Sequence, residues 1–260
     1  MELVGVPEHL RVLAENVVAE AEKDPRVLAV VVGGSVASGT GDEYSDLDLV
    51  LVCTAEGQPE CLAEAKEFAG RLGPLLASFT GEHVGEPRLL IALFGPPLVH
   101  VDLKFVTPDG YRDRVEDGLV LWQRDDTVER VRAESTAQWP QPDAQWIEDR
   151  FWVWVHYVAV KIARGELFEA IESLGAMRSI SIAPLAGIGR TTRPAGVRRL
   201  ETLAPELGPA LRETVATADR ADCLRALQAT VDVYRTVRER SGVQVVRRTA
   251  AEEAAVDFLG

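Results

Sequence analysis

Two aspartates, two residues apart, follow a glycine–serine turn near the start of the chain. The segment reads VVVGGSVASGTGDEYSDLDLVLV, with Gly33, Gly34 and Ser35 after one valine-rich run and Asp46 and Asp48 opening the next. Side chains alternate across a strand, so both aspartates are expected on one face. Adjacent carboxylates repel each other unless a cation lies between them, and hard oxygen ligands suit Mg²⁺ or Mn²⁺. The pair therefore predicts a divalent-cation site.

The glycine–serine turn has the features of a phosphate cradle. Gly33 and Gly34 lack a Cβ, so the backbone can turn sharply and its N–H groups can approach an anion. Ser35 is expected to cap the short segment 36–38 and to aim its hydroxyl at the same anion. Either feature alone is common, since many turns contain glycine and many strands begin with aspartate. Their combination between two apolar runs predicts metal-assisted phosphoryl or nucleotidyl transfer.

The run from Gly34 to Asp48 resembles the signature of the DNA polymerase β-type nucleotidyltransferase superfamily. The resemblance implies that Asp46 and Asp48 hold the catalytic metal and that Gly34 and Ser35 bind the phosphates of a nucleoside triphosphate such as ATP. It also implies a third carboxylate on a later strand, and the segment LVHVDLKFV offers Asp102. Two roles stay open for Asp102: a further metal ligand, or the base that takes the proton of the acceptor hydroxyl.

The segment around Asp102 alternates between polar and apolar side chains. His100, Asp102 and Lys104 share one face of the predicted strand, and the residues between them are apolar. His100 is open to two interpretations, a substrate contact or a structural histidine. Lys104 is either a phosphate ligand or an ion-pair partner of Asp102.

The first half of the chain predicts a small mixed sheet covered by helices. Apolar runs bounded by turn residues predict strands, and two amphipathic segments predict helices. The strands are expected over 27–32, 47–53, 88–94, 98–106 and 119–123, and the helices over 7–23 and 59–72. The polar stretch 124–142, with its prolines, is expected to connect two domains.

The second half is helical in pattern. Segment 144–164 is long and apolar nearly all round, which predicts a buried helix that Gly165 ends. In architecture this half resembles the helical domain of small-molecule nucleotidyltransferases that modify antibiotics, the aminoglycoside and lincosamide types. That resemblance implies that nucleotide and acceptor meet between the two halves. Further helices are expected over 166–186, 197–203 and 219–240.

The predicted fold is thus α+β, a nucleotidyltransferase-fold mixed β-sheet with helices followed by an all-α helical bundle. The catalytic domain is expected over 1–125 and the C-terminal helical domain over 143–260. Lys161, the only lysine of the second half, is a candidate ligand of the triphosphate; the alternative is a lysine that snorkels to water from a helix end. The arginines of segment 189–199 likewise bind triphosphate or lie on a solvated loop.

Composition places further bounds on function. No run is apolar enough to span a bilayer, and three cysteines without a CxxC pair predict neither disulfides nor zinc, so a reducing cytoplasm is expected. Residues 1–140 hold 25 acidic and 12 basic side chains, whereas residues 141–260 hold 16 of each. The acidic excess disfavours long nucleic acid as a partner and favours a small cationic acceptor, or serves only solubility.

Three functions are compatible with these features of the sequence. The first is a magnesium-dependent nucleotidyltransferase that modifies a hydroxyl group of a small molecule, with aminoglycoside and lincosamide antibiotics as the implied acceptors and antibiotic resistance as the consequence. The second is a nucleotidyltransferase that modifies a protein, of the toxin–antitoxin type. The third is a non-catalytic regulator that binds nucleotide. The sequence leaves the acceptor, the nucleotide and the oligomeric state open.

Overall fold

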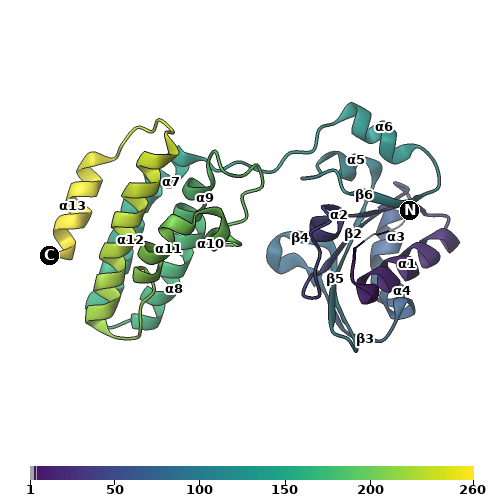
Figure 1. The fold of residues 1–260 in the computed structure, drawn as a ribbon, viewed down its shortest axis with the longest axis horizontal. Coiled ribbons are helices and arrows are strands. Elements are labelled where there is room, and N and C mark those ends of the chain that lie inside the picture. Colours follow the sequence, from purple (N-terminus) through teal and green to yellow (C-terminus); the bar gives the residue numbers. More distant parts are fainter. Residues whose placement is uncertain (1–2, 4) are drawn as a thin grey trace. The chain divides into compact units, whose positions relative to one another are not determined.

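The computed structural model divides into two compact units, Met1–Gln138 and Trp139–Gly260 (Figure 1). It describes residue 3 and residues 5–260; the predicted first domain begins at residue 1, and residues 1, 2 and 4 lie outside the described part. The first unit combines a mixed sheet with helices and the second is mostly helical. The predicted α+β fold class is confirmed.

The first unit is built on a six-stranded sheet with the order β3-β4-β5-β2-β1-β6. β2 pairs with β5 in parallel, and the other neighbouring strands pair antiparallel. The observed strands are β1 (Val27–Val32), β2 (Leu47–Cys53), β3 (Leu75–Gly81), β4 (Glu86–Phe94), β5 (Val99–Val106) and β6 (Leu119–Gln123). Five of them match the predicted strands closely, and β3 was not predicted.

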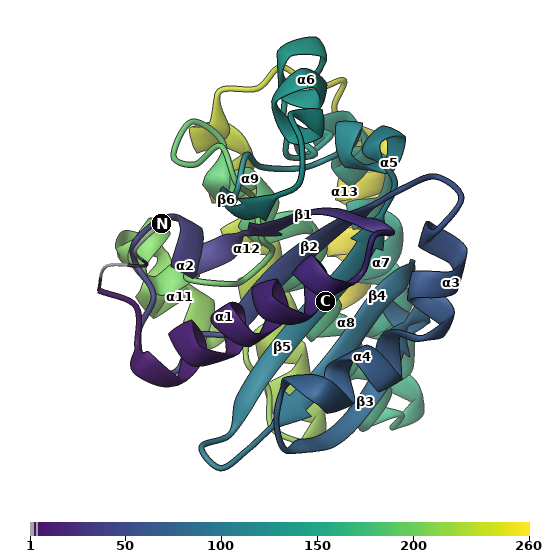
Figure 2. The same cartoon turned by 90° about the vertical axis from the view of Figure 1, so that its right-hand side faces the viewer.

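One face of the sheet carries the main core of this unit. Alternate residues of the central strands, such as Leu49 on β2 and Leu103 on β5, point into it and are almost fully buried. In Figure 2 the helices that cover this face lie in front of the strands. They are α1 (Glu8–Lys23), α3 (Gln58–Ala63) and α4 (Ala65–Leu72). α3 and α4 together replace the single helix predicted over 59–72.

The opposite face is covered only in part. A smaller core forms where α5 (Pro108–Arg112) and α6 (Thr127–Glu134) pack on β1 and β2. Helix α6 lies within the stretch that was predicted to be a connection. It packs on the sheet because Val128 and Val131 give it an apolar side that is buried. The part of this face formed by β4, β5 and the start of β2 carries half-exposed residues, among them Asp48 and Asp102.

The second unit contains two long helices, α7 (Ala144–Arg164) and α12 (Arg220–Ser241), packed on each other and on α8 (Leu167–Met177). The bounds predicted for α7 are confirmed. The Asp143 side chain accepts a hydrogen bond from the Trp146 amide at its start, and Gly165 ends it with φ +77°. α8 continues without a break through a π-helical segment, Arg178–Ile182, into α9 (Ala183–Gly187), so the helix predicted over 166–186 is confirmed, with a π-helical segment inside it.

The remaining helices of the second unit are short or terminal. They are α10 (Leu200–Leu203), the 3₁₀ turn η3 (Pro205–Leu207), α11 (Gly208–Glu213) and α13 (Thr249–Leu259). α13 was not predicted, and it packs against α7. Among the residues that the structure describes, no helix has the length and apolar character needed to cross a bilayer.

The expectation that α7 is buried on all sides is wrong. Trp146, Val153 and Tyr157 are 42%, 64% and 43% exposed within the structure. They lie seven and eleven residues apart, so they share one side of the helix. The guanidinium of Arg150 lies 4.1 Å from the centre of the Trp146 ring on the same side. The helix therefore has one buried side and one exposed side, and the exposed side is also largely apolar.

A buried ionic network joins three helices of the second unit. The carboxylate of Glu148 on α7 is fully buried and accepts hydrogen bonds from Tyr234 Oη at 2.5 Å and Arg238 Nη1 at 3.0 Å, both on α12. Arg238 also pairs with Glu252 on α13 at 3.2 Å. The amide of Arg248 donates to Glu148 as well. The terminal helix is thus held to the bundle by paired, desolvated charges.

Candidate functional site

The Gly33–Gly34 turn lies at the end of β1, against the start of β2. The Gly33 amide donates to the Asp48 carbonyl at 2.8 Å, which fixes the turn to the strand that carries the aspartate. Gly34 has φ +61°, a conformation that side chains other than glycine rarely adopt, and a Cβ at this position would collide with Oδ2 of Asp48. The turn therefore favours glycine, and it brings the Gly34 backbone close to the Asp48 carboxylate.

Replacement of Gly34 by alanine is expected to abolish the predicted nucleotidyl transfer and to destabilise the first unit. The left-handed backbone costs about 1–2 kcal/mol for a residue with a Cβ, and the new methyl group displaces the Asp48 carboxylate. Gly39→Ala is the matched control, because Gly39 has φ +69° but, apart from its chain neighbours, no described residue has an atom within 4 Å of its would-be Cβ. Thermal melting and pyrophosphate release measure both effects. Equal activity in the two variants would contradict a role for the turn.

Ser35 does not cap the helix that follows the turn, so this expectation is wrong. The short helix α2 (Gly34–Ala37) begins one residue earlier, with Gly33 as its N-cap and no capping side chain. Ser35 lies inside the first turn, and its Oγ is buried without a hydrogen-bond partner among the described residues. A buried hydroxyl normally has a partner, so this atom is available to a ligand at the turn.

Asp48 and Asp102 are direct partners in the parallel pairing of β2 and β5. Paired residues point to the same face, and neighbouring strands are about 4.8 Å apart, so the two carboxylates lie side by side. Nε2 of His100 lies 2.9 Å from Oδ1 of Asp102, and this histidine side chain is 53% exposed. The histidine thus contacts the predicted third carboxylate directly.

Asp46 directly precedes β2. It and Asp48 are half-exposed, whereas Leu47 and Leu49 are buried, so burial alternates as the sequence predicts. If the alternation of the strand extends to Asp46, its side chain lies on the same face as Asp48. The assembly of all three carboxylates at the start of β2 stays a prediction.

The donor set of this region fits a hard divalent cation. In the described part of the chain, no three histidine, cysteine, aspartate or glutamate side chains are already arranged around a metal position. Mg²⁺ is commonly held by one or two carboxylates together with the phosphate oxygens of a substrate. Asp48 and Asp102, paired in register on an open face beside the turn, supply oxygen ligands of that kind.

Glu116 is a residue of this region that the sequence did not indicate. Its Oε1 accepts a hydrogen bond from the Gly34 amide at 2.6 Å, and it would lie 2.8 Å from a Cβ on Gly33. Glu116 lies in the loop before β6, which pairs with β1 at the edge of the sheet. Glu116 could have been inferred only from a pairing of the short strand 119–123 with the strand that ends at the turn, because this pairing brings the preceding loop next to Gly34.

Lys104 pairs with Glu86 on β4 at 2.7 Å and not with Asp102 as one interpretation held. Hydrogen bonds from Arg88 and then from Lys104 lower the pKa of Glu86 to about 2, although partial burial opposes this shift. Glu86 is therefore ionised and engaged by both cations. It forms a structural ion-pair group on the same sheet.

Lys161 lies on α7 in the second unit. Its Nζ pairs with Glu166 at 2.6 Å, which raises the pKa of the lysine, and it lies 5.1 Å from the centre of the Tyr157 ring. In the 189–199 segment, Arg190 pairs with Glu206 at 2.5 Å. Both side chains have carboxylate partners in their own unit, and their contact with a triphosphate stays a prediction.

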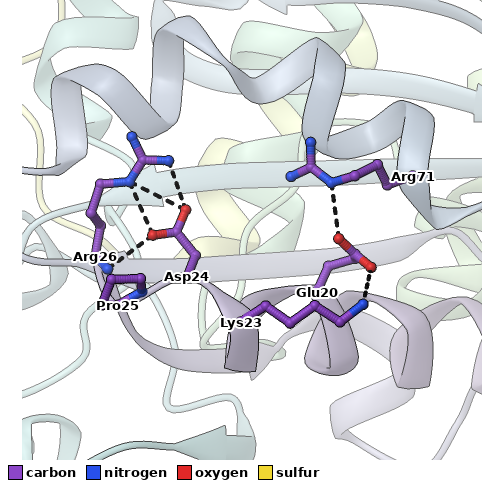
Figure 3. A pocket seen from close by; sticks show the side chains of 6 residues that line it. All are labelled: Glu20, Lys23, Asp24, Pro25, Arg26 and Arg71. Atoms are coloured by element: carbon purple, nitrogen blue, oxygen red, sulfur yellow. Dashed lines mark hydrogen bonds and ion pairs between the residues drawn. The ribbon is translucent and has the colours of Figure 1, made fainter.

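A surface pocket of about 420 Å³ lies elsewhere on the first unit (Figure 3). It is lined by Glu20, Lys23, Asp24, Pro25, Arg26 and Arg71. Its cations are already paired: Arg26 with Asp24, and both Lys23 and Arg71 with Glu20. Arg26 precedes β1 and Gly33 follows it, so the length of the strand, about 20 Å, separates this pocket from the turn.

A family of adenylyltransferases matches most of the chain. The family model, described as streptomycin adenylyltransferase, covers residues 9–254. Among solved structures, an aminoglycoside 6-adenyltransferase from Bacillus subtilis is 15% identical, with 94% of this chain and 95% of that chain covered and a TM-score of 0.43. A nucleotidyltransferase-like protein from Exiguobacterium sibiricum is 10% identical, covers 88% and 76% of the two chains, and has a TM-score of 0.41. No protein of curated function matches the sequence.

Proposed function

The chain belongs to the streptomycin adenylyltransferase family, and on that premise we propose that it transfers a nucleoside monophosphate from a nucleoside triphosphate to a hydroxyl group of a small-molecule antibiotic. The family makes it a small-molecule nucleotidyltransferase of the polymerase β type. The proposed acceptors are aminoglycosides and lincosamides, with aminoglycosides first because the family is described by streptomycin. ATP is the first nucleotide to test, because adenylyl transfer uses it as donor.

In this proposal each residue of the open face has a defined task. The backbone at Gly34 binds phosphate oxygens, and so does the hydroxyl of Ser35, which has no partner in the part of the chain that the structure describes. Asp46 and Asp48 hold Mg²⁺, which neutralises charge on the phosphates when it is bound. The acceptor hydroxyl attacks the α-phosphorus, its proton passes to a base, and pyrophosphate leaves. The chain's own contribution is chiefly to orient the two substrates and to stabilise developing charge.

The observation that carries the proposal is the register of the sheet. Asp48 and Asp102 are 54 residues apart in sequence but directly paired on β2 and β5, beside a turn whose left-handed backbone at Gly34 favours glycine. Paired carboxylates on an open face are costly in the absence of a cation. A nucleotide whose phosphates bind at the adjacent turn would bring the cation that offsets the repulsion between these two carboxylates.

The experiment that tests the proposal is a screen of ATP, GTP, CTP and UTP against a panel of aminoglycosides and lincosamides. Pyrophosphate release with Mg²⁺ present is the readout. Release that depends on one nucleotide and one acceptor class supports the proposal. Nucleotide binding without release for any acceptor would favour the regulator, and release that requires a protein acceptor would favour the protein-modifying alternative.

One substitution distinguishes the two possible roles of Asp102, base and metal ligand. Asp102→Asn is expected to lower turnover by at least about a hundredfold whether the residue is the base or a metal ligand. If it is the base, binding of a non-hydrolysable magnesium–nucleotide measured by calorimetry stays within about twofold of the wild type. If it is a metal ligand, that binding weakens as well. Unchanged turnover would remove Asp102 from the reaction.

A further inference from the structure

A carboxylate occupies the turn that the proposed function assigns to phosphate. Oε1 of Glu116 accepts the Gly34 N–H at 2.6 Å, a short distance that is typical of hydrogen bonds to ionised oxygens. The same oxygen lies so close to Gly33 that a Cβ there would be 2.8 Å away. Ser35 Oγ, in the same turn, is buried and has no partner among the described residues.

The backbone on both sides of Glu116 is fixed. Arg114 pairs with Asp117 at 2.5 Å, and Arg132 donates to the Gly118 carbonyl at 2.7 Å. Gly118 packs so closely on the end of β1 that a Cβ there would collide with the Val32 carbonyl. The loop therefore holds Glu116 beside the turn. Its side chain has rotatable bonds of its own, so the carboxylate can swing away while the loop stays in place.

From this contact we propose that Glu116 is a built-in competitor of the nucleotide, an anion that the triphosphate displaces from the Gly34 amide when it binds. The inference rests on the proposed function, because it takes the turn as the phosphate site. A phosphate oxygen and the Glu116 carboxylate both need the same N–H, and two anions cannot share one donor at hydrogen-bond distance. Breaking the hydrogen bond between Glu116 and Gly34 costs part of the binding free energy of the nucleotide, so Glu116 lowers the affinity for it.

The physical consequence is a gain of binding when the carboxylate is removed. Glu116→Gln keeps the size of the side chain but replaces the charged acceptor by a neutral amide. Glu116→Ala removes the acceptor altogether. Ordinary loss of a binding residue would weaken nucleotide binding, so the direction of the change distinguishes a competitor from a ligand or a structural support.

The test is calorimetry with three probes: inorganic tripolyphosphate and the magnesium complexes of α,β-methylene-ATP and α,β-methylene-GTP. We expect the affinity for the nucleotide to rise by about three- to tenfold in Glu116→Ala and by less in Glu116→Gln, the range for one competing charge-assisted hydrogen bond. Glu43→Gln is the matched control, because it removes one negative charge from the exposed loop before β2. It is expected to change affinity by less than about twofold, since exposed charges are screened by salt.

Each outcome of this test decides the inference. Tighter binding in both Glu116 variants, with Glu43→Gln unchanged, supports it even if no acceptor is ever modified. Equal or weaker binding in the Glu116 variants overturns it and leaves the proposed function intact, provided the wild type binds nucleotide. If the wild type and every variant bind none of the probes, both the inference and the proposed function fail. Thermal melting confirms that the variants are folded.

Discussion

Asp48→Asn is expected to leave a folded protein with at least about a hundredfold less transfer activity. The substitution removes one of two carboxylates that lie side by side on β2 and β5, and with it a charge that the proposed cation site requires. Stability without metal should be unchanged or higher, because the repulsion between Asp48 and Asp102 is relieved. Pyrophosphate release and thermal melting measure the two effects side by side.

The control for this variant is Glu67→Gln, which removes one charge from the exposed side of α4 in the same unit. It should retain wild-type activity and stability. Asp46→Asn should behave like Asp48→Asn, since both aspartates precede or begin the same strand. Full activity in Asp48→Asn would remove the carboxylate pair from the reaction, whatever the family membership of the chain.

Glu148→Gln is expected to destabilise the second unit by about 3–5 kcal/mol, the usual result of breaking one side of a buried ion pair. Both carboxylate oxygens of Glu148 accept hydrogen bonds, from Trp152 and the Arg248 amide on one side and from Tyr234 and Arg238 on the other. An amide nitrogen cannot accept any of them. Urea denaturation followed by tryptophan fluorescence reports on this unit, because four of the five tryptophans lie in it.

Asp149→Asn is the matched control on the next residue of α7. Asp149 pairs with Arg248 at 2.7 Å but is exposed to solvent, so the midpoint of denaturation should hardly move. A similar loss in the two variants would show that burial of the Glu148 network adds nothing. Activity measured at low temperature, where Glu148→Gln is still folded, should stay close to that of the wild type.

The same network predicts how the stability of the second unit depends on pH. Burial opposes ionisation of Glu148, but hydrogen bonds from Tyr234, the Arg248 amide and Arg238 outweigh it, and the pKa of Glu148 lies below the ordinary value of 4.5. A depressed pKa in the folded state adds stability above the unfolded pKa and loses it as the pH falls. The wild type should therefore lose stability below about pH 4.5, and Glu148→Gln should lose less over that range.

The sequence was informative where one residue pattern decides one element. β1, β2 and β6 have the predicted bounds, because each is an apolar run between turn residues. α7 starts and ends where predicted, since Asp143 and Gly165 have the chemistry of helix caps. By contrast, β3 is an edge strand whose side chains are mostly exposed or half-exposed, and such a strand shows no alternation for a pattern to detect.

In the candidate site, too, local sequence patterns indicate some residues, whereas others depend on tertiary contacts. The Asp46–Asp48 spacing is a local pattern, whereas Asp102 was chosen on the polar face of β5 because the family resemblance implies a third carboxylate; the roles of all three stay predictions. The contact between Glu116 and Gly34 joins residues 82 apart and depends on the order of strands in the sheet, which no local pattern contains. The partner of Lys161, Glu166, is only five residues away, but α7 ends at Gly165 between them. The i,i+3 and i,i+4 spacing of a helix therefore does not predict this ion pair.

The central claim is that this chain transfers a nucleotidyl group, and the position of a label in the donor tests it most directly. The wild type would be incubated with Mg²⁺, the acceptor found in the screen, and ATP labelled at either the α- or the γ-phosphate. Attack at the α-phosphorus predicts that the α-label appears in the acceptor and that the γ-label leaves in pyrophosphate. Transfer of the γ-label to the acceptor would make the chain a phosphotransferase and would contradict the claim.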